Sequence, residues 1–266
     1  MQQQRSVNLA KGNPVGTHGT RNASFLLAYA FALATLWSTV LTIEGQTPRP
    51  SAATANLTSD QIVERMAERN AERAKQLRSY TDERHYTLTY HGIPKSVTAA
   101  MVVAATYEAP STKKFQILSS TGPKVLINQV LKRLLESEED AAKNPDRTAL
   151  TSANYTFTLL GTGDVAGRHC YVFHVDPKQD NKFLYRGKVY IDAEDFAVTQ
   201  IAVEPAKNPS FWIRKTQIDH VYKKTGQFWL PERNRSESKL RVGGTAVLTI
   251  DYGEYRVQPL PTRRNE

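Results

Sequence analysis

Residues 188–201 read KVYIDAEDFAVTQI, and this stretch indicates the fold class of the chain. Apolar residues cluster on either side of a short acidic run, Asp192 to Asp195, which interrupts their pattern. Asp favours tight turns because its side chain accepts hydrogen bonds from the backbone that follows it. The stretch therefore predicts two antiparallel strands joined by a hairpin, and it assigns the acidic residues to the turn.

The same period-two pattern recurs along most of the chain. It predicts strands at 80–90, 97–107, 113–119, 154–160, 169–176, 182–192, 196–204, 211–223, 227–241 and 245–257. Turn signals separate these strands, namely Gly92–Pro94, Gly122–Pro123, Gly161–Gly163, Asp176–Pro177 and Gly243–Gly244. About ten strands joined by short turns predict one antiparallel sheet, curled or closed, rather than βαβ units.

Two amphipathic segments stand beside this strand pattern. The first begins at Ser59, a residue type that caps helices, and continues to about residue 80 with apolar positions near the 3.6-residue period. Its opposite face is charged and carries Glu64, Arg65, Glu68, Arg69, Glu72 and Arg73. The second, KVLINQVLKRLLESEEDAAK at 124–143, lies between the third and fourth predicted strands. The fold class is therefore α+β and mainly antiparallel β, with two helices that cover a sheet.

The first 58 residues have the pattern of an export segment followed by a linker. Residues 1–23 are basic and contain no acid, and 24–43 hold an apolar run at 25–43. Nineteen helical residues cover about 28 Å, close to a hydrocarbon core, so a membrane anchor and a cleaved signal peptide both fit. A buried core helix fits less well, because the run has no polar face. Residues 44–58 are rich in Pro, Ala and Thr, which predicts a linker.

Export changes the meaning of the charge. The chain holds 35 Lys and Arg against 26 Asp and Glu, a net charge of +9. Arg5, Lys11 and Arg21 account for +3, and they orient the apolar run so that the rest of the chain lies outside the cytoplasm. A nucleic-acid partner is therefore disfavoured. A lone Cys170 suits an oxidising compartment, and the absence of a Cys directly after the apolar run excludes lipid attachment as a lipoprotein.

The sequence carries no catalytic or metal-binding motif. His85 and His91 share a strand face but lie roughly 20 Å apart, too far to bind one metal ion. The acidic residues Asp192 and Glu194 belong to the predicted hairpin, which leaves a glycan or lipid hydrolase as a minor alternative. Cys170 lies in an apolar strand and is interpreted as a small buried hydrophobe. We expect no enzyme, no metal and no cofactor.

An excess of aromatic and aliphatic residues points to a hydrophobic cavity on the concave side of the sheet. Small residues on one face of 97–107 (Thr98, Ala100, Ala104 and Thr106) would leave room there, although a sheet closed around packed side chains remains an alternative. The residues predicted to line the cavity are Met101, Val103, Leu131, Leu134, Phe183, Tyr185, Trp212 and Trp229.

The order of these elements resembles the LolA/LolB lipoprotein-carrier superfamily. That group includes the lipid-binding N-terminal domain of RseB/MucB regulators and many outer membrane lipoprotein-sorting proteins. The resemblance covers about residues 57–258, and it rests on SDQIVERMAERNAERAKQLRSY (59–80), KVYIDAEDFAVTQI (188–201), FWLP (228–231) and LTIDYGEYRV (248–257). It implies one domain over 59–258, followed by a flexible tail at 259–266.

The resemblance also implies a half-open, curved β-barrel whose concave side, covered by an N-terminal helix and a lid helix, accepts acyl chains. In carriers of this kind a buried Arg helps to hold the lid closed through hydrogen bonds to the backbone. Arg84 and Arg186, each in an otherwise apolar strand, are the candidates for this role. An uncleaved anchor would depart from the family pattern, because it prevents free shuttling between membranes.

Three functions follow from this pattern. The favoured hypothesis is a non-enzymatic protein on the periplasmic side of a bacterial cell envelope, either anchored by residues 25–43 or secreted after signal cleavage. It would bind a lipid or a lipidated protein, and lipoprotein sorting or transport is one use of such binding. A membrane-anchored sensor or interaction module of the RseB type is the second hypothesis, and the envelope hydrolase is the third.

Overall fold

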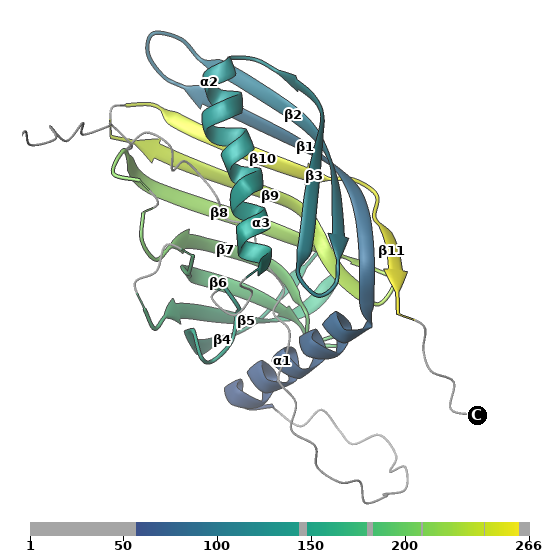
Figure 1. Ribbon diagram of the computed structural model, residues 1–266. Helices are drawn as coiled ribbons and strands as arrows, with labels where there is room; N and C mark the ends of the chain where they lie inside the picture. The colour runs from purple at the N-terminus through teal and green to yellow at the C-terminus, as the bar shows by residue number, and fades with distance from the viewer. Residues whose placement is uncertain (1–56, 144–147, 180–182, 209, 242, 261–266) are drawn as a thin grey trace, which may run out of the picture.

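The computed structural model describes residues 57–143, 148–179, 183–208, 210–241 and 243–260, which form a strongly curved sheet with two helical segments against it (Figure 1). The helical segments are α1 (Ser59–Gln76) and a continuous run of α2 (Lys124–Leu126), the π-helix η1 (Ile127–Leu131) and α3 (Lys132–Lys143). The strands are β1 (Leu77–His91), β2 (Val97–Glu108), β3 (Thr112–Thr121), β4 (Tyr155–Val165), β5 (Arg168–Pro177), β6 (Tyr185–Asp192), β7 (Val198–Pro205), β8 (Ile213–Thr225), β9 (Phe228–Leu240), β10 (Thr245–Tyr252) and β11 (Arg256–Pro259).

The sheet is antiparallel and open. Its strand order is β3-β2-β1-β10-β9-β8-β7-β6-β5-β4, with β11 paired to β1, so β3 and β4 form its two edges. The chain passes from one edge to the other between β3 and β4, and the α2–η1–α3 run makes this passage across the concave face (Figure 1). The predicted antiparallel sheet with a leading and an inserted helix is confirmed, and the inserted helix covers the sheet because it connects the two edges.

The first helix differs from its prediction at both ends. Its N-cap is Thr58 rather than Ser59: the Thr58 side chain accepts from the Gln61 backbone N–H, and the Gln61 side chain accepts from the Thr58 N–H. The helix ends at Gln76, and the chain is already extended at Leu77, where β1 begins. β11 pairs with this first part of β1. Residues 77–80, which the sequence pattern assigns to the helix, therefore belong to the sheet.

One turn and one strand also differ from the sequence prediction. Gly161–Gly163 lie inside β4 rather than in a hairpin turn, and Gly161, with φ +133°, stands beside a bulge where the β4–β5 register shifts. The turn itself is at Ala166–Gly167, both with positive φ. The predicted strand 245–257 is interrupted, so that β10 pairs with β9 and β1, and β11 pairs with β1 alone.

Buried apolar residues form separate clusters under the two helical segments. One cluster joins η1 and α3 to β1, β2 and β10, and includes Leu131, Leu134, Met101 and Leu248. The other packs the N-terminal half of α1, through Ile62, Val63 and Met66, on strands β4 to β8. The concave face is therefore covered in two places rather than under one continuous layer.

The predicted membrane or signal segment at 25–43 lies outside the described residues. Among the residues that the structure does describe, no helix is both long and apolar enough to cross a membrane.

Candidate functional site

A cavity of about 440 Å³ lies between the two helix-covered areas. Its walls come from the second half of α1, the end of α3, the loop at 148–153 and the sheet. The side chains that face it are mostly aliphatic and aromatic, and they include Leu77, Tyr80, Tyr107, Tyr185, Val198, Ile201, Tyr222, Phe228, Trp229 and Leu230. Its volume falls within the usual range of small-molecule sites, about 300–1,000 Å³.

Small side chains on α1 provide the space. Ala67, Ala71 and Ala74 recur every three to four residues, so they lie on one helical face, and all three line the cavity. The first half of the same helix carries Ile62 and Met66, which are fully buried against the sheet. α1 therefore packs tightly at its beginning and leaves a gap towards its end, where its side chains are too short to reach the strands.

The structure divides the predicted lining residues into three groups. Tyr185 and Trp229 line the cavity. The four residues Met101, Val103, Leu131 and Leu134 instead belong to the filled cluster under α3, with at most 1% of each exposed. Phe183 is half-buried in the turn just before β6, and Trp212 is 47% exposed.

The small residues of β2 do not make the cavity. Ala99, Met101, Val103 and Ala105 form the buried face of β2, whereas the alternate positions, from Thr98 to Thr106, lie on the other side of the strand and are absent from the cavity wall. The expectation that Thr98, Ala100, Ala104 and Thr106 leave room on the concave side is wrong. A period-two pattern identifies two faces, but it does not say which of them is concave when both are apolar.

A cluster of buried charges joins α3 to β1 at the border of the cavity. The Arg84 guanidinium donates from Nη1 to Glu138 Oε2 on α3 at 2.9 Å and from Nε to Asp82 Oδ2 on its own strand at 2.7 Å. Lys113 Nζ, on β3, donates to the same Glu138 oxygen at 2.9 Å. The Tyr86 hydroxyl donates to Glu138 Oε1 at 3.3 Å. We call these five residues the Arg84 cluster, and its centre is closed to solvent: the Arg84 and Glu138 side chains are each 1% exposed.

The charges in the Arg84 cluster support one another. Burial alone would raise the pKa of Glu138, but the nearby Lys113 and Arg84 outweigh it and hold the pKa of this carboxyl below its usual range. Burial alone would lower the pKa of Arg84, yet Glu138, Tyr86 and Asp82 raise it well above its usual value. Both side chains are therefore charged at neutral pH, and the ion pair that attaches α3 to the sheet is complete.

Arg186, the other arginine predicted to hold a lid, lies in a different environment. Its Nε donates to Asp176 Oδ1 on β5 at 2.6 Å, and its side chain is 53% exposed. This contact joins two neighbouring strands and no helix. Of the two candidates, Arg84 is the one that bonds to the inserted helix.

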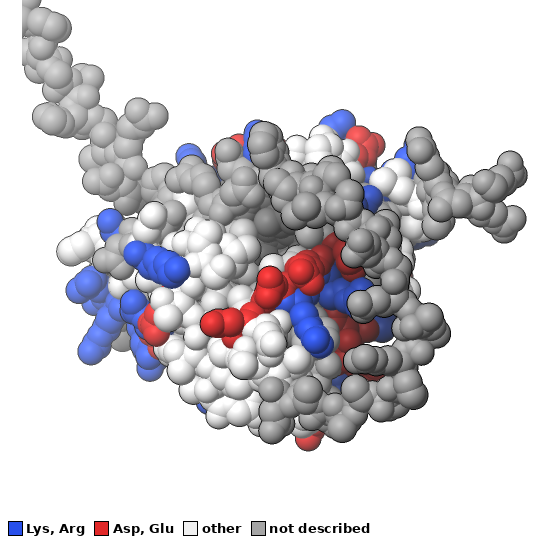
Figure 2. Space-filling view, turned by 90° about the horizontal axis from the view of Figure 1, so that it is seen from below, with Lys and Arg blue, Asp and Glu red and all other residues white. Residues whose placement is uncertain are grey.

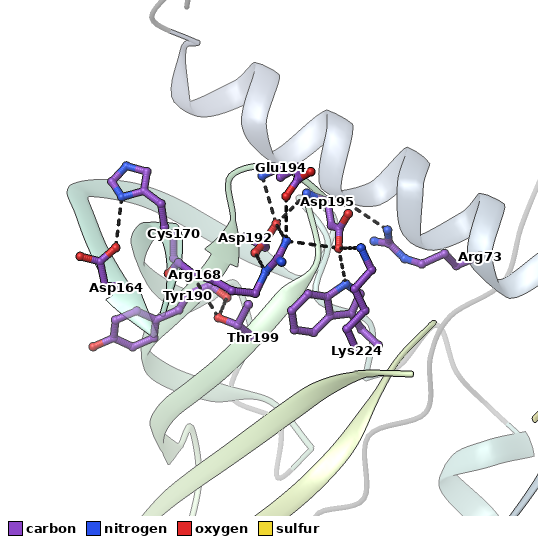
Figure 3. Close-up of polar contacts among 12 residues, drawn as sticks. Arg73, Asp164, Arg168, Cys170, Tyr190, Asp192, Glu194, Asp195, Thr199 and Lys224 are labelled. Carbon is purple, nitrogen blue, oxygen red and sulfur yellow. Dashed lines mark hydrogen bonds and ion pairs between the residues drawn. The ribbon is translucent and has the colours of Figure 1, made fainter. Parts of the chain in front are cut away.

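A second polar cluster lies at the end of α1, under the molecule as Figure 1 shows it. The Arg73 guanidinium of α1 donates to two backbone carbonyls of the β6–β7 turn, Asp195 O at 3.0 Å and Phe196 O at 3.2 Å. The Asp195 carboxylate accepts from Trp229 Nε1 at 2.9 Å and pairs with Lys224 Nζ at 2.7 Å. Figure 3 shows how Arg73 and Lys224 approach Asp195 from different elements. We call Arg73, Asp195, Lys224 and Trp229 the Asp195 cluster.

The acidic turn is structural. Asp192 is 1% exposed; its Oδ1 accepts from the backbone N–H groups of Glu194 and Asp195, and both its oxygens pair with Arg168. Arg168 and these turn contacts lower the pKa of Asp192 despite burial, which opposes them. Carboxylates and cations thus alternate on this face, as Figure 2 shows in the view from below. The paired acids of a glycosidase are not formed here, because Glu194 is a solvated partner of Arg168 and Asp192 is committed to the turn.

The structure also describes the surroundings of Cys170 and of the possible metal-binding side chains. Cys170 is fully buried, and burial raises the pKa of its thiol, so it packs as a small hydrophobe. No group of three or more His, Cys, Asp or Glu side chains that could hold a metal ion occurs among the described residues. The wall of the cavity is mostly apolar, with charged residues such as Arg73, Lys113 and Glu138 at its border.

Comparison with known proteins gives one family match. A family model described as a family of unknown function, DUF5686, matches residues 148–253, which contain strands β4 to β10. No curated protein matches the chain.

Several solved structures are similar to this chain, all at low identity. A domain assigned to outer membrane lipoprotein sorting from Vibrio parahaemolyticus matches with 12% identity and a TM-score of 0.42, over 77% of this chain and 96% of that one. A LolA superfamily protein from Nitrosomonas europaea matches with 12% identity and a TM-score of 0.35, over 77% and 96%. The MucA/MucB complex of Pseudomonas aeruginosa matches with 11% identity and a TM-score of 0.26, over 77% and 99%. The likeness to these structures concerns the fold alone.

Proposed function

We propose that this protein is a non-enzymatic binder of the cell envelope that holds the acyl part of a lipid, or of a lipidated protein, in the cavity between α1 and α3. The observation that carries the proposal is the cavity of about 440 Å³ with its mostly apolar wall. Each CH₂ group removed from water there contributes about 0.8 kcal/mol. A linear acyl chain supplies many such groups without any polar group that the wall would leave unpaired.

The Arg84 cluster would control the size of the site. Glu138 and Lys113 belong both to this cluster and to the cavity wall, so a displacement of α3 opens the cavity on that side. The part of the concave face now filled by Leu131 and Leu134 would then become available to a longer ligand. In this proposal Arg84 holds the lid, through a carboxylate of the helix, and Arg186 has no part in it.

The place of the protein in the cell is part of the proposal. Residues 25–43 would insert into the inner membrane as an anchor or direct secretion before cleavage, and 44–58 would link this segment to the domain at 59–258. The basic flank at 1–23 favours an orientation with the domain on the periplasmic side. With an uncleaved anchor, the protein would present or sense lipids at the membrane rather than carry them between membranes.

A cavity-filling variant tests the proposal directly. Ala74→Phe places a ring in the gap under α1, and Lys75→Phe adds the same ring on the solvent side of the same helix turn, where the side chain is exposed. The full chain is purified from its own envelope fraction, and the lipids that copurify are identified by mass spectrometry of organic extracts. Displacement of a fluorescent fatty acid then compares the affinities of the two variants.

We expect the unmodified chain and Lys75→Phe to retain lipid and Ala74→Phe to lose it, with about ten-fold or weaker fatty-acid binding, since a few CH₂ groups are excluded. An unmodified protein that carries no lipid and does not bind the fluorescent fatty acid would refute the proposal. A protein partner that remains crosslinked after delipidation would instead support the sensor hypothesis.

A further inference from the structure

A second surface, at the opposite end of the sheet from the Asp195 cluster, collects exposed apolar side chains. The three most exposed large hydrophobic residues among those described are Ile93 (93%), Phe211 (75%) and Val125 (69%), and Trp212 is 47% exposed. They lie in the β1–β2 loop, before β8 and at the start of α2. All of these segments are at the upper left in Figure 1.

Contacts between neighbouring segments bring these residues together along one end of the sheet. The Arg241 N–H donates to Trp212 O at 2.9 Å, which joins the β9–β10 turn to the start of β8. The Tyr90 hydroxyl, before the β1–β2 loop, donates to Gly243 O at 3.4 Å. Gly122, just before α2, lies so close to β2 that an added Cβ would meet Thr98 O at 2.4 Å. We call the described residues of 91–96, 121–125, 211–215 and 239–244 the basic rim.

The charged side chains of the basic rim are all positive. Its four segments contain no Asp or Glu, and their cations are Lys95, Lys124, Arg214, Lys215, Lys239 and Arg241, all exposed. Lys215 pairs with Glu204 at 2.6 Å, whereas no ion pair connects the other five to an acid in the described part of the chain. Lys215 and Lys239 are also direct cross-strand partners. Like charges opposite each other destabilise a sheet, so an external anion would relieve this arrangement.

Within the basic rim, a cationic side chain lies directly against an exposed aromatic ring. The Arg241 guanidinium lies 5.2 Å from the centre of the Phe211 ring, and this ring contacts Trp212 edge to face with centroids 5.6 Å apart. Trp and Phe beside Lys and Arg match the interface of an anionic bilayer, where rings enter the headgroup layer and cations meet lipid phosphates. A soluble polyanion would use the cations but would leave Ile93 and Val125 without a partner.

From this combination we propose that the basic rim docks on the surface of an anionic lipid bilayer, with Ile93, Phe211 and Trp212 inserted between headgroups. This contact goes beyond the cavity function and does not depend on what the cavity holds. It would orient the domain so that the Asp195 cluster, at the other end of the sheet, points away from the membrane.

The test uses the full chain in lipid nanodiscs of phosphatidylcholine, with or without phosphatidylglycerol. An environment-sensitive fluorophore on Ile93→Cys reports contact with lipids that carry a quencher; Cys170 is fully buried and is not labelled. The same fluorophore on Glu254→Cys, a fully exposed position beyond the far end of β10, serves as the control site. We expect quenching at residue 93 that depends on phosphatidylglycerol and disappears at high salt, and none at residue 254.

Charge reversal provides the second arm. In the Ile93→Cys background, Lys95→Glu, Lys124→Glu and Arg241→Glu together should weaken the lipid contact by about ten-fold or more, because each cation near an anionic surface contributes roughly five-fold. The matched control reverses Lys75, Arg78 and Arg256, three exposed cations at the other end of the sheet, and should retain the contact. Equal quenching at residues 93 and 254, no dependence on phosphatidylglycerol, or a response to a soluble polyanion such as heparin in place of lipid would each overturn the proposal.

Discussion

Both helical segments that cover the concave face pack apolar side chains on the sheet, but their polar attachments differ. α3 is joined to β1 by a buried ion pair, Arg84 to Glu138, in which both side chains are 1% exposed. α1 packs through Ile62 and Met66 and is secured at its end by Arg73, which donates to backbone carbonyls of a turn. α1 also continues directly into β1, whereas residues 144–147, outside the described part of the chain, follow α3.

This difference indicates which helix can move. The acceptors that hold the end of α1 are backbone carbonyls, which do not change charge with pH. In addition, α1 cannot leave the sheet without disrupting the start of β1, because the chain runs directly from one into the other. The attachment of α3 depends on two side chains being charged in a place without water, where removing either partner leaves the other with a large desolvation penalty. The contact is thus strong when complete and is lost when either charge is removed, and this is the property that the proposed lid function uses.

The largest effect is expected when the buried pair is broken. Arg84→Met removes the cation and leaves Asp82 and Glu138 buried, and we expect a loss of about 3–5 kcal/mol in the free energy of unfolding. Urea denaturation of the variant and the unmodified chain measures this loss. The matched control is Arg186→Met, whose exposed pair with Asp176 should contribute less than about 1 kcal/mol.

A double-mutant cycle with Glu138→Leu assigns the loss to the contact with α3. If the two side chains stabilise the fold through each other, the double variant should lose less than the sum of the single variants. Additive losses would mean that Arg84 stabilises β1 through Asp82 alone, and α3 would then have no charged attachment to this strand.

Acid should weaken the same region through His220, which is buried on β8 and stacks on Tyr222 with ring centroids 4.4 Å apart. Burial lowers the pKa of His220 to about 3. An unfolded chain binds this proton below about pH 6.5, and the folded chain does so only near pH 3, so stability is lost as the pH falls through this window. The loss for this group approaches about 1.4 kcal/mol per pH unit at most.

Denaturation between pH 7 and pH 4 measures this slope. His220→Phe keeps an aromatic ring on Tyr222 but does not titrate, so its stability should fall less steeply with acid than that of the unmodified chain. His169→Phe replaces a side chain that is 61% exposed and should keep the original slope. The Glu138 carboxyl, whose folded pKa is lowered, adds a loss of the same sign at lower pH in all three proteins. Identical slopes for His220→Phe and the unmodified chain would contradict the prediction.

A smaller effect is expected at the end of α1. Arg73→Met removes the donor from Asp195 O and Phe196 O, and a half-buried contact of this kind should cost about 1–2 kcal/mol. Faster hydrogen exchange in the last turn of α1, measured by mass spectrometry, is the specific readout. Arg69→Met is the control, because Arg69 is 61% exposed and pairs with Glu72 on the same helix. Unchanged exchange in Arg73→Met would show that apolar packing alone holds α1.

The sequence predicts the local elements better than the contacts between them. The hairpin at 188–201 and the helix at 124–143 follow from residue period and turn chemistry, which act over a few residues. The bulge beside Gly161 depends on where β5 pairs, and Arg73 has the period of a solvent-facing residue although its acceptors lie 122 and 123 positions further along the chain. Neither can be derived from a local pattern.

The site shows the same limit. Arg84 could be selected because it interrupts an apolar strand, but its partner Glu138 appears as one of several acids at the end of a helix. The cavity was expected beside the small residues of β2, yet the space is under α1. The signal that could have located it was the spacing of Ala67, Ala71 and Ala74, a small-residue face on a helix that otherwise alternates large apolar and charged residues.

The smallest expected effect comes from a half-exposed ion pair, Lys224 to Asp195, and it provides a contrast to the buried pair of α3. Lys224 is 41% exposed, and after Lys224→Met the Asp195 carboxylate still accepts from Trp229, so the loss should stay below about 1 kcal/mol. In 1 M salt, where charges are screened within about 3 Å, this loss should vanish. The loss caused by Arg84→Met should persist there, because its partners are closed to solvent. If salt removed both losses equally, the ion pair of α3 would be accessible to water, and only apolar packing would distinguish α3 from a surface helix.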